Sequence, residues 1–303
     1  MRNSDYKCSK AIHYQMANPD HKVTLSTTRS SATTRPPSSL HDLAKSLWLY
    51  RRLLQQLILR DVASRYRGSL AGILWSLLLP CIMLGVYVFV FGYVFAPARA
   101  LGKTITPDFA LSLFTGMLLH GLVAECLARA PAAILGQPSY VKKVVFPIEL
   151  LPLTIVGTAV VQFLMGSGVL FVALAATQGL PLKAFFWPLA WLPLIALAGG
   201  LSFILSALTV FLRDLAQITG FIATLLLFLS PVFYPLASVS KGLQYWMLLN
   251  PLTIPIEASR AMLIQGNWPD WAALGWHSLA SLAALGVGWW IFQRTRRGFS
   301  DVI

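Results

Sequence analysis

Three arginines lie just before the first long apolar run of the chain, and their chemistry suits a phosphate group. Arg60, Arg65 and Arg67 are followed by Gly68, which allows a sharp turn into the apolar run. A guanidinium donates hydrogen bonds in a planar fork that matches two phosphate oxygens. We therefore expect these arginines to meet a phosphate at a membrane boundary. Simple anchoring of a span end by positive charge stays open as the alternative.

Acidic and basic residues also occur inside or beside apolar runs, where ionisable groups are functional candidates by default. Glu125 and Arg129 are four positions apart, so on a helix they face each other and form a pair. Glu257 and Arg260 have the matching spacing of three and form a second pair. Glu149 opens a predicted helix, where a carboxylate suits the N-terminus and indicates a capping role. For Glu125 and Arg129, a purely structural pair at the membrane interface stays open as the alternative.

One tripeptide resembles the end of a nucleotide-binding loop, but its context excludes that function. Gly102-Lys103-Thr104 would need a glycine at position 97, and that position is Pro97. The sequence shows no Ser-His-Asp order, no metal-ligand cluster and no carboxylate pair with the spacing of a glycosidase. We conclude that any ATP driving this protein is bound by another subunit.

The composition places these residues in a membrane protein. Hydrophobic residues make up 56% of the 303 positions and charged residues 12%, where soluble domains have roughly a quarter charged. A helix needs about 20 apolar residues to cross the hydrocarbon core. The pattern predicts an all-α membrane protein with six transmembrane helices, at about 70–96, 109–128, 150–177, 185–212, 215–236 and 272–293.

Charge sets the expected orientation of these spans. Lys and Arg total 24 against 11 Asp and Glu, and most of the basic residues beside the spans fall on the side that holds both termini. That side should be cytoplasmic. The basic pI of about 10.0 thus indicates contact with membrane lipids and not with nucleic acid. The apolar run 242–256 is too short to cross and predicts a re-entrant helical segment between spans five and six.

The chain divides into three parts by composition. Residues 1–40 are polar and rich in Ser, Thr and Pro, and we expect a disordered cytoplasmic tail. Residues 41–67 predict an amphipathic helix in the membrane interface. Residues 68–303 form the transmembrane domain. The apolar face of the amphipathic helix should consist of Leu40, Leu43, Leu47, Leu54 and Ile58.

Five motifs follow one another along residues 40–300. They are Arg65-Tyr66-Arg67-Gly68-Ser69 with Gly72-Ile73-Leu74-Trp75-Ser76, the run from Val141 to Pro152, Phe211-Leu212-Arg213-Asp214, the run from Ser230 to Pro235, and Leu249-Asn250-Pro251-Leu252. In this order the motifs resemble the permeases of ABC type 2 polysaccharide exporters, which export O-antigen, capsule and teichoic acid. Several ordered matches along one chain are more specific than any one of them.

The resemblance implies a permease of the bacterial inner membrane that is not itself an enzyme. It implies a second copy of the chain and two ATP-binding cassette subunits, which hold ATP and Mg while this chain holds no cofactor. The loop 129–146 would contact those subunits, so we assign coupling to Glu125, Arg129, Lys142 and Lys143. The substrate would be a glycan on undecaprenyl diphosphate, and we expect Arg60, Arg65 and Arg67 to bind its diphosphate. Glu257 and Arg260 would close an outer gate.

The resemblance also implies a path formed mainly by the first and fifth spans of both copies. Aromatic rings stack on the apolar C–H faces of sugars without holding them tightly, which suits a glycan that must slide. Packing or lipid-facing aromatic residues are the alternative. The candidates for the path are Tyr87, Phe91, Phe95, Phe221, Phe228, Phe233 and Tyr234.

Three other functions stay open on the sequence. The chain could be an ABC type 2 permease for another lipid or a drug, a membrane-embedded glycosyl- or acyltransferase, or a secondary transporter. The transferase would need a membrane-facing His or Asp cluster, which the sequence lacks. The secondary transporter would need acidic residues deep in its spans.

Overall fold

The computed structural model describes residues 39–69, 72–91, 107–141 and 146–302. These residues form helices, turns and loops and contain no strand, which confirms the all-α prediction for the described part of the chain. Nearly all of the predicted tail, together with Phe95, Lys142 and Lys143, lies outside the described residues.

Helix α1 (Leu40–Arg65) begins at a capping box. The Ser39 hydroxyl accepts from the Asp42 amide, and the Asp42 carboxylate accepts from the Ser39 amide, each at 3.2 Å. The Ser39 side-chain and backbone hydrogen bonds lower the pKa of the Asp42 carboxyl. α1 covers most of the segment predicted as amphipathic. Its most buried side chains are Leu43, Leu57 and Val62, of which only the first was on the predicted apolar face.

Three described segments are long and apolar enough to cross a membrane, judged by length and composition: 108–129, 150–177 and 182–209. They correspond to α3 (Pro107–Arg129), α6 (Leu150–Thr177) and α7 (Pro188–Thr209), the last with the 3-10 turn Leu182–Phe186 before it. All three match predicted spans.

The other three predicted spans are helical but less clear-cut. α2 (Trp75–Phe89) and α8 (Leu215–Leu229) are shorter apolar helices, and α11 (Trp271–Thr295) is long but less apolar. α8 was predicted to continue to residue 236. It stops at Leu229 because Ser230 precedes a proline and takes the extended conformation that this position favours. The number of spans therefore stays a prediction.

Helices α7 and α11 approach each other closely through glycine. A side chain at Gly288 would collide with the backbone of Gly200, and a Cβ at Gly200 would lie 2.5 Å from the Ala284 carbonyl oxygen. Small residues at such contacts let two membrane helices pack backbone to backbone. Next to this contact, the Phe203 ring lies 5.3 Å from that of Trp289.

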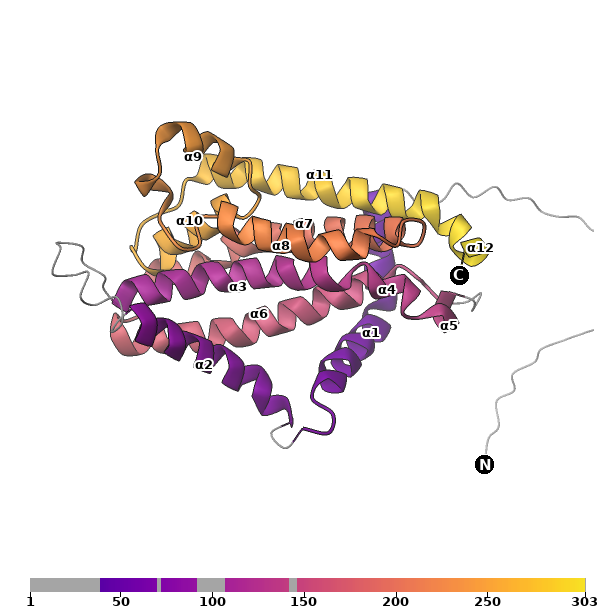
Figure 1. Ribbon diagram of the computed structural model, residues 1–303, viewed down its shortest axis with the longest axis horizontal. Coiled ribbons are helices and arrows are strands. Elements are labelled where there is room, and N and C mark those ends of the chain that lie inside the picture. The colour runs from indigo at the N-terminus through magenta and orange to yellow at the C-terminus, as the bar shows by residue number, and fades with distance from the viewer. Residues whose placement is uncertain (1–38, 70–71, 92–106, 142–145, 303) are drawn as a thin grey trace, which may run out of the picture. The chain divides into compact units, whose positions relative to one another are not determined.

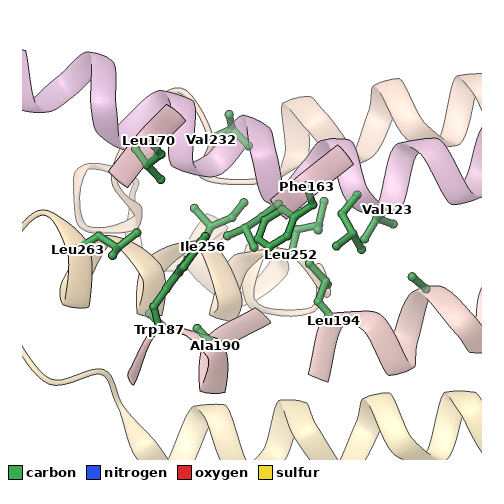
Figure 2. Close-up of a cluster of buried hydrophobic side chains, with 14 of the residues drawn as sticks. Val123, Phe163, Leu170, Trp187, Ala190, Leu194, Val232, Leu252, Ile256 and Leu263 are labelled. Carbon is green, nitrogen blue, oxygen red and sulfur yellow. The ribbon is translucent and has the colours of Figure 1, made fainter. Parts of the chain in front are cut away.

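The main core lies between α3, α6, α7 and α10 (Thr253–Leu263), as Figure 2 shows. The Trp187 ring lies 5.5 Å from Phe163, and its indole N–H donates to the Ser259 hydroxyl at 2.8 Å. That bond satisfies the one polar atom of a buried tryptophan. A second buried cluster joins α1 and α4 (Ala132–Leu135) to the ends of α7 and α11. Its members are Leu43, Ile134, Ile148, Leu151, Phe203, Ala207, Val210, Trp289, Phe292 and Phe299.

The short helices gather at the two ends of the bundle (Figure 1). α4, α5 (Pro138–Val141) and α12 (Phe299–Val302) lie at one end, and α9 (Lys241–Leu248) and α10 lie at the other. The run 242–256 thus forms parts of two short helices, neither of which has the length to cross a bilayer. Whether this pair re-enters the membrane stays a prediction.

Candidate functional site

Two acidic and two basic side chains join α1 to α3. Arg129 donates from Nη2 to both carboxylate oxygens of Asp61, at 2.9 Å each, and lies 3.2 Å from Glu125. Arg65 pairs with Glu125 and lies 4.0 Å from Asp61. We refer to these four residues as the ion-pair network. Each of its side chains keeps between 21% and 32% of its surface exposed, so water still screens the charges.

The spacing of the residues explains why the network forms. Asp61 and Arg65 are four apart on α1, and Glu125 and Arg129 are four apart on α3, so each pair occupies one face of its helix. The two faces meet with the acid of each helix opposite the base of the other. Each arginine therefore has one partner on its own helix and one on the neighbouring helix.

A polar cleft of about 490 Å³ lies beside the network, between α1, α4 and α6 and the end of α3. Arg60, Arg67 and Arg129 line it on the basic side, and Asp61 lines it on the acidic side. Among the described residues of this region, four arginines face two carboxylates, Asp61 and Glu125. The excess positive charge makes the cleft suitable for an anion. Its remaining lining residues are Leu57, Ser64, Ala128, Ala132, Ala133, Gln137, Leu151, Thr154 and Ile155.

Arg60 and Arg67 carry this excess charge. Arg60 is exposed, donates to the Tyr140 hydroxyl at 3.0 Å, and stands 5.9 Å from the centre of that ring. Through Tyr140 it connects α1 to α5 in the loop 129–146. Arg67 is exposed and has no ion pair with any residue that the structure describes.

The network brings together residues that the sequence had assigned to separate roles. Arg65 was expected to bind phosphate, while Glu125 and Arg129 were expected to take part in coupling. Asp61 was not singled out, although its spacing to Arg65 repeats that of Glu125 to Arg129. That repeat is the signal that would have found it.

Glu149 forms a further connection near the same end of the bundle. Glu149 occupies the N-cap position of α6, at the predicted helix start, but its side chain makes no capping hydrogen bond there. It accepts instead from the Ser46 hydroxyl at 3.3 Å and lies 3.2 Å from Arg296. α1 is thus attached to α6 through its first half and to α3 through its last turn.

The path residues predicted on the first span rest against α3. The Tyr87 ring lies 6.3 Å from Phe114, and the Phe91 ring lies 5.2 Å from Phe109. Within this single chain, both rings have packing partners on the neighbouring helix.

Two of the path residues predicted on and after the fifth span stand free of the bundle. Phe221 is 67% exposed and Phe228 is 61% exposed. Phe233 is half-buried and stacks 5.9 Å from Phe228, and the half-buried Tyr234 donates to the Phe228 carbonyl at 3.2 Å. The exposed face of α8 is mainly apolar and also carries the exposed polar residues Gln217 and Thr224. Its large apolar residues are Ile218, Phe221, Ile222, Leu225, Phe228 and Leu229.

The expected gate pair forms and has additional partners. Arg260 is buried and lies 3.0 Å from Glu257. Its guanidinium also donates to the carbonyls of Val232 at 2.5 Å and Tyr234 at 3.2 Å, and Glu257 accepts from the Leu236 amide at 3.2 Å. The pair therefore fixes the loop after α8 onto α10.

The described residues hold no group of three or more His, Cys, Asp or Glu side chains that could bind a metal ion. The polar chemistry of the described site is thus that of arginines and carboxylates at one end of the bundle.

Comparison with known proteins gives consistent matches. Residues 52–264 match the model of the family described as "ABC-2 type transporter". The chain is 28% identical over 264 residues to the O-antigen export system permease protein RfbA of Myxococcus xanthus, covering 86% of this chain and 99% of that protein. It is 24% identical to RfbA of Klebsiella pneumoniae, covering 80% and 92%. It is 26% identical to the polysialic acid transport protein KpsM of Escherichia coli, covering 80% and 93%.

Proposed function

Because the chain belongs to the ABC-2 type transporter family, we propose that it is the permease subunit of an ABC exporter that moves a lipid-linked polysaccharide out of a bacterial cell. One observation carries the proposal most. Relatives named for O-antigen export and polysialic acid transport align with this chain over more than nine-tenths of their own length.

In this proposal the permease crosses the inner membrane six times, with both termini in the cytoplasm. α2, α3, α6, α7, α8 and α11 are the spans. The end that carries α4, α5 and α12 then faces the cytoplasm, and the end with α9 and α10 faces outward (Figure 1). The excess of basic residues beside the cytoplasmic ends supports this orientation.

Two ATP-binding cassette subunits supply the energy, and they carry the ATP and Mg. The loop 129–146, with Lys142 and Lys143, contacts them. Arg129 is both the last residue of α3 and the first residue of that loop, and it is bound to Asp61 on α1. Movement of the loop would therefore reach α1 through a direct ion pair.

The substrate is a glycan carried on undecaprenyl diphosphate, and its diphosphate binds in the polar cleft. Arg60 and Arg67 are the contacts best placed for this, because they line the cleft and carry its excess charge. Arg65 contributes through the ion-pair network. Two copies of the chain form the path, with α2 and α8 of each along it. The exposed rings of Phe221 and Phe228 supply stacking surfaces for the sugar.

The proposal is tested by deleting the gene and measuring glycan on the cell surface. We expect surface polysaccharide to disappear and lipid-linked polysaccharide to accumulate inside, with both effects reversed by the wild-type chain. Unchanged surface glycan in the deletion strain would refute the proposal. That result would favour the alternative function, a permease for another lipid or a drug.

A further inference from the structure

A second cavity, of about 280 Å³, lies at the end of the bundle opposite the polar cleft. It is formed by α10, the loop 264–270 and the first turn of α11, with Leu236 and Leu248 closing one side. Its polar lining residues include Glu257, Gln265 and Asp270, and its aromatic residue is Trp268. We refer to it as the outer pocket.

The loop that builds the outer pocket is fixed by backbone geometry. Gly266, three residues after the end of α10, has a φ of 62°, a conformation that residues other than glycine rarely adopt. The Asn267 amide then donates to the Ala261 carbonyl at 2.7 Å. From the other side, the Lys183 ammonium donates to the Gly266 carbonyl at 2.6 Å. The loop therefore holds the residues after Gly266 across the face of α10.

Trp268 is held in place but is not buried. Its ring centre lies 5.3 Å from that of Phe186 and 5.9 Å from that of Trp271, and the Lys183 ammonium lies 5.2 Å from it. The side chain nevertheless stays 50% exposed and lines the pocket. A rigid, half-exposed aromatic ring beside a cavity provides a preformed stacking surface.

The acceptors of the outer pocket are only partly used within the chain. Asp270 accepts the Ala272 and Ala273 amides through Oδ1, which caps α11. Glu257 accepts from Arg260 and from the Leu236 amide through Oε1. The second oxygen of each carboxylate has no hydrogen-bond partner among the described residues. Each can accept a hydroxyl from a ligand.

This combination points to a sugar. The aromatic ring suits the C–H face of a pyranose, and the carboxylates and the Gln265 amide suit its hydroxyl groups. The lining contains no Lys or Arg, and Asp270 has no ion pair with any described residue, so a phosphate or an acidic sugar would meet an unpaired negative charge at Asp270. The volume lies just below the usual range of about 300–1,000 Å³ for small-molecule sites, which fits one sugar ring.

We propose that the outer pocket binds one uncharged sugar unit of the exported glycan as the chain leaves the membrane. This inference rests on the proposed function, which supplies the glycan and places the pocket on the outer side. It adds a saccharide subsite outside the polar cleft and the path along α2 and α8.

The test is saturation-transfer NMR on the purified chain in nanodiscs, with methyl glycosides of glucose, galactose and mannose as probes and methyl glucuronide as the anionic comparison. We expect transfer to at least one neutral glycoside at millimolar concentration and at least fivefold weaker transfer to the glucuronide. Trp268→Leu should abolish the signal. Trp276→Leu is the matched control, because Trp276 is 73% exposed on α11 and does not line the pocket.

A second variant guards against a folding defect. Asp270→Asn keeps a residue that caps helices equally well but removes the charge, and it should weaken transfer severalfold with unchanged thermal stability. Equal signals from wild type and Trp268→Leu, or no transfer to any neutral glycoside, would overturn the pocket assignment. The binding assay needs neither ATP nor export. A negative result would therefore refute the pocket assignment alone, whereas unchanged surface glycan in the deletion strain would refute the proposed function.

Discussion

Arg129, the last residue of α3, donates to both carboxylate oxygens of Asp61 on α1, at 2.9 Å to each. The contact links the start of the loop 129–146 to the helix that carries Arg60 and Arg65. In the proposed exporter, the ATPase contact and the substrate contact are therefore separated by a single ion pair. This arrangement leads to predictions that treat the two roles as one mechanical unit.

The first prediction concerns coupling between Asp61 and Arg129. Asp61→Asn and Arg129→Gln should each lower surface glycan severalfold, because each leaves its partner without its main counter-charge. The double variant should lose less than the product of the two single effects, corresponding to a coupling energy of about 0.5–3 kcal/mol. Quantitative immunoblotting of surface glycan, normalised to the amount of chain in the membrane, measures this. Fully multiplicative losses would mean that the ion pair does not couple the helices.

The second prediction separates diphosphate recognition from structural support. Arg67→Ala should lower surface glycan roughly tenfold, which corresponds to one charge-assisted hydrogen bond, and should leave the thermal midpoint unchanged. Arg65→Ala should lower both glycan and thermal midpoint, because Arg65 pairs with Glu125. Glycan output and thermal unfolding in detergent are measured on the same preparations. Normal surface glycan from the Arg67→Ala variant would remove Arg67 from the substrate site.

The third prediction tests the close packing of α7 and α11. Gly288→Ala should destabilise the protein by about 1–3 kcal/mol, because the new methyl group meets the backbone of Gly200, which has no side chain to move. Gly275→Ala on the same helix is the control, since nothing lies within 4 Å of its Cβ position. Thermal unfolding, monitored by size-exclusion chromatography, should give a lower midpoint for Gly288→Ala than for Gly275→Ala. Equal midpoints would show that the two helices do not pack as described.

The fourth prediction concerns Arg260, which is buried and bound to two loop carbonyls as well as to Glu257. Arg260→Leu should cost about 3–5 kcal/mol, because it leaves buried partners unpaired. Glu257→Gln should cost less, about 1–3 kcal/mol, because the glutamine oxygen still accepts from the Leu236 amide and from Arg260, although the buried guanidinium loses its counter-charge. The comparison uses membrane yield and thermal midpoint. A larger loss from Glu257→Gln than from Arg260→Leu would contradict the assigned geometry.

The sequence predicted the all-helical class and three long spans well, because apolar runs of sufficient length with few charges have few alternatives. It misjudged the end of α8, where the local preference of Ser230 before Pro231 overrides the apolar pattern. It placed Glu149 correctly at the start of α6 but expected its side chain to cap the helix, and that hydrogen bond does not form. The residue pairs instead with Arg296, which lies far away in the chain.

The sequence predicted which residues share a face within each helix of the candidate site. It did not predict how the two helices come together. The spacings within α1 and within α3 are visible in the sequence, whereas the register between the two helices is set by packing. The outer pocket shows the same limit. Asp270 is recognisable in the sequence as a residue that starts a helix, but only the fold places it with Glu257 around one cavity.

The central claim is that this chain has no energy source of its own and exports a lipid-linked glycan only with a separate ATPase. The most direct measurement reconstitutes the purified chain in proteoliposomes loaded with lipid-linked glycan, with and without the partner ATPase subunits. We predict that glycan reaches the opposite leaflet only when the ATPase subunits and ATP are both present. Glycan movement or ATP hydrolysis by this chain alone would contradict the claim.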